Sequence, residues 1–98
     1  MIYSFEWDTN KAKTNFSKHN IRFEDAVSVF RDKNAISIYD EKNSAKEDRW
    51  VTIGMDFKTR TMVVIHTFVY VDSKSCNIRI ISARRATKKE QREYKDSL

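Results

Sequence analysis

The second half of the chain contains three runs in which apolar and polar residues alternate, and only short polar segments separate them. The runs cover residues 49–56, 62–71 and 76–83, with turns at 57–60 and 72–75. Side chains of a strand point alternately to its two faces, so each run predicts a strand with one buried face. Successive strands joined by such short turns pair antiparallel, because a parallel pair needs a long crossover. The sequence therefore predicts a sheet built from consecutive hairpins.

The first half adds helices to this sheet. Apolar residues recur at spacings of three and four in 23–30, which is typical of a helix with one buried side. Near the other end of the chain, Thr87 and Glu90 form a Thr-x-x-Glu capping box that predicts the start of a last helix. The predicted order is β-α-α-β-β-β-β-α, an α+β fold in which a small antiparallel sheet carries its helices on one face. The remaining predicted elements are strands at 2–7 and 35–39 and a helix at 9–18.

Length and composition predict one small domain over residues 1–98. Cys76 is the single cysteine, so neither an internal disulfide nor a cysteine-built zinc site is expected, and no cofactor is predicted. No apolar stretch reaches the ~18 residues of a membrane span. The first residues lack the basic segment of a secretory signal, so we expect a cytoplasmic protein with no membrane partner.

The net charge of +5 is concentrated at the end of the chain. Residues 79–98 hold seven Lys or Arg against three Asp or Glu, a difference of +4, whereas residues 1–78 contribute +1. Such asymmetry indicates a polyanionic partner, RNA or DNA. The alternative is a basic helix that only keeps the protein soluble.

The polar turn at 72–75 suggests a register for the last hairpin, with Val71 opposite Cys76. This register predicts an aliphatic face under the helices, made of Val63, Ile65, Val69, Ile78 and Ile80. The other face would carry basic, aromatic and hydrogen-bonding groups, which can stack on bases and hold phosphates. Its predicted members are Trp50, His66, Phe68, Tyr70, Asn77 and Arg79.

Each of these residues also has an ordinary structural interpretation. His66 can be a hydrogen-bonded histidine of the sheet, and His19 can interact with the last carbonyls of a helix. Two histidines so far apart make a poor metal site. Arg79 can be an edge charge that prevents aggregation, and Tyr94 can pack back on the sheet.

Five blocks of the sequence resemble one known family. They are FEWD at 5–8, KAKTNFSKHNIRFEDA at 11–26, DRWVTIG at 48–54, VVIHT at 63–67 and IRIISARRATKKEQREY at 78–94. In this order they resemble the BrnT toxins of bacterial type II toxin–antitoxin systems, over residues 5–94.

The resemblance implies a fold similar to that of the RelE ribonuclease toxins. It also implies an endoribonuclease that cleaves RNA, expected to be mRNA, and thereby arrests translation. A BrnA-type antitoxin would neutralise it, and the complex would bind promoter DNA mainly through the antitoxin.

RNA cleavage without a metal ion can use the adjacent 2′-hydroxyl as nucleophile, with an acid, a base and a cation for the phosphorane. Arginine suits the last role because its planar fork holds two phosphate oxygens. We expect Arg49, Arg79 and Arg84 in this role. For proton transfer the best candidate is His66, whose unperturbed pKa of about 6.5 lies near working pH.

Other residues are expected to assist. His19 is the second candidate for proton transfer, and Tyr94 could stack on a base or orient the 2′-hydroxyl. The residues expected to bind RNA are Lys18, Arg85, Lys88, Trp50 and Phe68.

Two alternatives remain from the sequence. The chain could bind nucleic acid without chemistry, in which case labelled RNA incubated with EDTA would shift but stay intact. It could also be an interaction scaffold whose sheet face binds an antitoxin segment, with little of the salt dependence that RNA binding shows.

Overall fold

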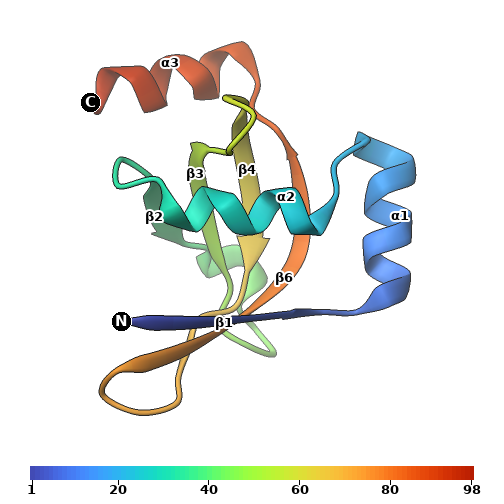
Figure 1. Cartoon of the computed structure of the whole chain (residues 1–98), viewed down its shortest axis with the longest axis vertical. Helices are drawn as coiled ribbons and strands as arrows, with labels where there is room; N and C mark the ends of the chain where they lie inside the picture. Colours follow the sequence, from blue (N-terminus) through green and yellow to red (C-terminus); the bar gives the residue numbers. More distant parts are fainter.

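The computed structural model describes all 98 residues and contains a mixed six-stranded sheet and three α-helices (Figure 1). The α+β class is confirmed. The strand order is β1-β6-β4-β3-β2, and β5 pairs with β6. The elements are β1 Ile2–Trp7, α1 Thr9–His19, α2 Phe23–Val27, the 3-10 helix η1 Ser28–Arg31, β2 Ile36–Tyr39, the 3-10 helix η2 Glu41–Asn43, β3 Trp50–Met55, β4 Thr61–His66, β5 Val69–Tyr70, β6 Ser75–Arg85 and α3 Lys88–Asp96.

One strand pair is parallel, so the prediction of a purely antiparallel sheet is wrong at this point. β1 runs parallel to β6, from Ile2 opposite Ser75 to Trp7 opposite Ile80, while the other pairs are antiparallel. Short turns fix the direction only of strands that follow each other in the sequence. Helices follow β1 directly, so no turn constrained its direction.

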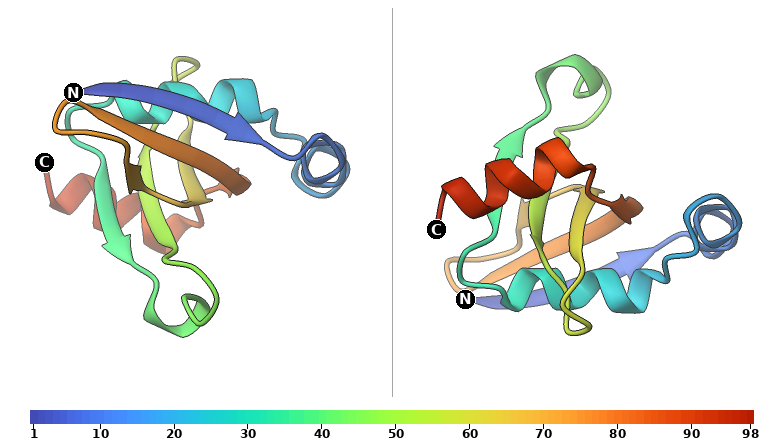
Figure 2. Two further views of the ribbon diagram at one scale, coloured as in Figure 1. Left: turned by 90° about the horizontal axis from the view of Figure 1, so that it is seen from below. Right: turned by 90° about the horizontal axis from the view of Figure 1, so that it is seen from above.

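The helices cover both faces of the sheet, whereas the sequence predicted one. α2 and η1 pack on the face formed by residues such as Val64, Ile78 and Ile80, here called the α2 face. Tyr94 of α3 packs against Val63 on the opposite face, the α3 face. Both views in Figure 2 show α2 and α3 on opposite sides of the strands. Neighbouring residues of β4 are both buried, so this strand needs cover on both faces. None of the helices is both long and apolar enough to cross a membrane.

A β-bulge in β6 sets which side chains share a face. Ile65 lies opposite Ser82 but His66 lies opposite Ile80, so Ile81 is an extra residue without a partner. Paired residues point to the same face, which places His66 with Ile80 on the α2 face. Arg79 precedes Ile80 and therefore points to the α3 face. The prediction that His66 and Arg79 share a face is wrong.

Asn15 attaches α1 to the part of β6 that β1 leaves uncovered. β1 pairs with β6 only as far as Ile80. Beyond it, the Asn15 amide donates to the carbonyl of Ala83 at 2.9 Å and accepts from its N–H at 3.0 Å. A third bond, at 3.2 Å, reaches the carbonyl of Ile21. Asn15 is only 5% exposed, because its side chain takes the hydrogen-bonding place of a neighbouring strand.

Replacing Asn15 with Ala is expected to lower the free energy of unfolding by about 2–4 kcal/mol, because three buried backbone groups lose their partner. Ser17→Ala, on an exposed position of the same helix, should change it by no more than about 0.5 kcal/mol. Urea denaturation measures both variants. Equal stability of the two would contradict this role of Asn15.

Candidate functional site

Three of the predicted arginines gather on the α3 face. Arg84 lies opposite Val63 on this face, and Arg79 points the same way from β6. The Nη2 atom of Arg79 donates a hydrogen bond to Oε1 of Glu47. The Nη2 atom of Arg49 lies 3.6 Å from the same oxygen. Two guanidinium groups, one from β6 and one from the residue before β3, thus meet at one carboxylate.

Glu47 is the functional candidate that the sequence did not reveal. It lies in the polar segment between η2 and β3, where no periodicity predicts the direction of a side chain. Its side chain is 35% exposed, so solvent reaches this group of charges. The Nε atom of Arg49 is buried without a hydrogen-bond partner. The three charges therefore leave hydrogen-bonding capacity unused.

A furrow runs from this group along α1. It consists of two hollows of about 470 Å³ and 270 Å³, which share Lys11 and Ile81 as lining residues. We call it the α1 furrow. Arg79 and Glu47 line the first hollow, and the predicted residues Lys18 and His19 line the second. The other lining residues are Glu6, Trp7, Asp8 and Ile80 in the first hollow and Asn10, Thr14, Asn15 and Ser82 in the second.

Arg84 is paired with the start of α3. Its guanidinium donates to both carboxylate oxygens of Glu90, at 2.8 and 2.9 Å. Together with the Thr87 N–H, this pairing lowers the pKa of Glu90 to about 2. The predicted capping box is confirmed, since Thr87 accepts from the Glu90 N–H. Arg84 therefore also holds the last helix in place.

Two of the predicted cations lie beside this ion pair. Arg85 is exposed and, opposite Met62, belongs to the α2 face. Lys88 is exposed in the first turn of α3. Neither lines the α1 furrow.

His66 lies on the α2 face with both ring nitrogens bonded, and it is 1% exposed. Nδ1 lies 2.9 Å from the carbonyl of Thr67 and must donate, because a carbonyl only accepts. Nε2, 2.6 Å from the Thr52 hydroxyl, therefore accepts. The Ser37 hydroxyl lies 2.7 Å from the Thr52 hydroxyl and extends this series of hydrogen bonds. Burial lowers the pKa of His66 below its ordinary value of 6.5.

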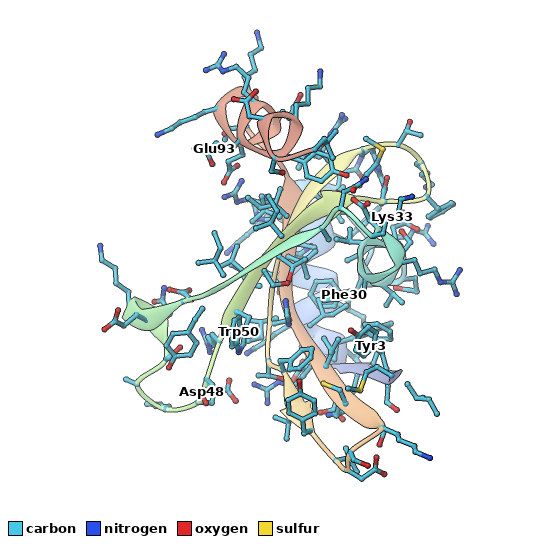
Figure 3. All side chains as sticks on the ribbon, turned by 90° about the vertical axis from the view of Figure 1, so that its left-hand side faces the viewer. Tyr3, Phe30, Lys33, Asp48, Trp50 and Glu93 are labelled. Atoms are coloured by element: carbon cyan, nitrogen blue, oxygen red, sulfur yellow. The ribbon has the colours of Figure 1, made fainter.

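Beside His66 is a cavity of about 550 Å³, which we call the aromatic cavity. The predicted RNA-stacking residues Trp50 and Phe68 line it, with ring centroids 6.5 Å apart. Figure 3 shows Trp50 near Phe30 and Tyr3, which line the same cavity. The aromatic cavity belongs to the α2 face, so the sheet separates it from Arg79.

Tyr94 is almost fully buried, with 4% exposed. Its hydroxyl donates to Oδ2 of Asp32 at 2.5 Å, and the Met55 N–H donates to the same oxygen at 2.8 Å. Burial, with a further contribution from Asp32, raises the pKa of Tyr94 to about 12. Tyr94 thus joins α3 to the segment that follows η1.

The three arginines and most of the α1 furrow lie within a region that matches a family model. The model describes the ribonuclease toxin BrnT of type II toxin–antitoxin systems, and it matches residues 7–90. The chain belongs to the BrnT family. The matched region includes Glu47, the three arginines and the lining residues of the α1 furrow except Glu6, whereas Tyr94 lies beyond it.

A solved BrnT structure has a similar fold. It is the crystal structure of the Brucella abortus ribonuclease toxin BrnT, which matches with a TM-score of 0.60 and 26% sequence identity. The match covers 90% of this chain and 100% of the Brucella chain. A search of curated protein sequences found no match to the chain. The likeness to RelE toxins stays a prediction.

The lowered pKa of His66 predicts a loss of stability in mild acid. The neutral imidazole contributes stability above pH 6.5, and this is lost as the pH falls through the lower pKa of the folded state. The free energy of unfolding, measured with urea from pH 7.5 downwards, should therefore decline below about pH 6.5. His66→Gln should be less stable at neutral pH but lack this decline, and His19→Gln should retain it. A decline of equal size in the wild type and His66→Gln would contradict the assignment.

Proposed function

We propose that this BrnT-family chain is an endoribonuclease that cleaves RNA on its α3 face, with the 2′-hydroxyl as nucleophile and without a metal ion. The observation that supports this most is the meeting of Arg49 and Arg79 at Glu47, which lines the first hollow of the α1 furrow. Two guanidinium groups at one point provide the charge that a metal ion would otherwise supply to the phosphorane.

The rest of the furrow suits the flanking nucleotides. Lys11, Lys18 and His19 line it beside β6. An α-helix rises about 1.5 Å per residue, so Lys11 and Lys18 lie roughly 10 Å apart along α1. Their charges can therefore bind successive phosphates of a single strand, which fixes the position of the RNA but reads no sequence. Arg84, on the same face, would add a cation at the far end.

The predicted roles of several other residues change with their position. We assign His66 and Tyr94 to stability rather than to chemistry, because both are buried and their polar side-chain atoms are hydrogen-bonded within the protein. Trp50 and Phe68 line the aromatic cavity on the other face, so they have no part in the proposed RNA contact. His19 remains exposed in the furrow.

The wider biological role follows from the family. The family is described as the toxin of a type II toxin–antitoxin system, so an antitoxin protein is the expected partner. We propose that mRNA is the substrate and that its cleavage arrests translation. A BrnA-type antitoxin would neutralise the chain, and promoter DNA would be bound only through the complex.

The purified chain should cleave labelled single-stranded RNA in the presence of EDTA, and Arg79→Ala should cleave about 100-fold more slowly or worse, because one phosphorane-stabilising group is lost. The matched control is Arg31→Ala, which removes the same charge from an exposed position of η1. Single-turnover rates measure the difference. RNA that is bound but left intact, or equal rates for both variants, would contradict the proposal.

A further inference from the structure

We propose that Glu47 is the general base of this site and takes the proton from the attacking 2′-hydroxyl. The inference rests on the proposed function and adds a catalytic residue to it. Of the two histidines, the one expected to act as base, His66, is buried on the opposite face of the sheet. A base on the α3 face must therefore be another group.

The hydrogen bonds of Glu47 leave one of its oxygens free for a substrate. Arg79 and Arg49 both approach Oε1. No protein group bonds or pairs with Oε2, and the side chain is partly exposed. The arginines orient the carboxylate through one oxygen, and the other oxygen is available to accept a proton. A general base needs both a fixed orientation and a free acceptor atom.

The arginines place the reacting atoms next to this carboxylate. In RNA the 2′-oxygen attacks the phosphorus attached to the neighbouring 3′-oxygen. A phosphate held by Arg79 and Arg49 thus has its nucleophile beside the groups that hold it. Since Glu47 contacts both guanidinium groups, base and phosphate-binding groups are close enough to act on one nucleotide.

The proton of the 2′-hydroxyl moves to Oε2 of Glu47 while the 2′-oxygen forms a bond to phosphorus. Arg49 and Arg79 stabilise the negative charge that develops on the phosphorane oxygens. The bond from phosphorus to the 5′-oxygen then breaks, and the departing oxygen takes a proton from water. The products are a 2′,3′-cyclic phosphate and a 5′-hydroxyl.

Other carboxylates of the first hollow fit this role less well. Asp8 is the N-cap of α1, and its Oδ1 accepts the Lys11 N–H at 3.0 Å. Glu6 lies opposite Arg79 in the β1–β6 register but forms no ion pair. Only Glu47 touches the two arginines.

A contrasting role for Glu47 gives the opposite result when it is replaced. If its carboxylate only neutralised Arg49 and Arg79, it would compete with RNA phosphates for them. Removing its charge would then free both arginines and speed cleavage. The direction of the rate change therefore separates a base from a competing anion.

The test uses the full chain with a Glu47→Gln substitution, and Glu41→Gln as a control that removes the same charge from an exposed position nearby. Glu47→Gln should slow single-turnover cleavage about 100- to 10,000-fold. Its affinity for a 2′-O-methyl RNA of the same sequence should be equal or higher. Glu41→Gln should match the wild type in both measurements. Cleavage by Glu47→Gln at the wild-type rate or faster would overturn the proposal.

Further variants separate the chemistry from the fold. Glu47→Asp keeps a carboxylate and should cleave faster than Glu47→Gln, and added formate should partly restore cleavage by Glu47→Ala. If neither occurs while thermal unfolding is unchanged, Glu47 is not the base. A wild-type chain that leaves RNA intact would overturn the proposed function and this role together, whereas an active wild type with an equally active Glu47→Gln overturns the role alone.

Discussion

The pairing of β4 with β6 decides which chemical groups can act together. A single extra residue, Ile81, shifts the register between Ile65 and His66. His66 lies on the α2 face with Val64, where its ring contacts the ring of Phe30, and the shift turns Arg79 to the α3 face. Without the bulge, histidine and arginine would share one face. With it, the molecule has a basic face and an aromatic face that are separated by the sheet.

The two faces have different physical properties. On the α2 face, His66 and Thr52 are buried, and their polar atoms bond to each other and to neighbouring groups. On the α3 face, the group formed by Arg49, Arg79 and Glu47 is partly exposed, and the Arg49 Nε lacks a partner. Buried, satisfied polar groups stabilise a fold, whereas exposed and incompletely paired charges are available to a ligand. This difference is why we place RNA chemistry on the α3 face.

Much of the fold could be predicted from local sequence patterns. The capping box at Thr87 fixed the start of α3, and the 3.6-residue periodicity located α2 and η1. The candidate arginines followed from charge and chemistry. Each of these signals lies within one short segment of the sequence, so it can be recognised without knowing how the segments pack.

What the sequence could not predict depends on contacts between distant segments. The bulge at Ile81 exists only in the pairing of two strands, and the burial of Asn15 exists only because β1 ends at Trp7. Glu47 lies in a segment without periodicity, and its meeting with Arg79 joins residues far apart in the chain. Local patterns carry no information on such contacts, so the two faces of the predicted site were assigned incorrectly.

The central claim is that RNA binds the α3 face and not the aromatic cavity. NMR spectra of the labelled chain, titrated with a 2′-O-methyl RNA that lacks the nucleophile, test it directly. Chemical shifts should change for the side-chain Nε–H of Arg79 and for backbone amides of Glu47 and Lys11, while the indole N–H of Trp50 stays unchanged. Shifts confined to Trp50 and Phe68, with Arg79 and Glu47 unaffected, would contradict it.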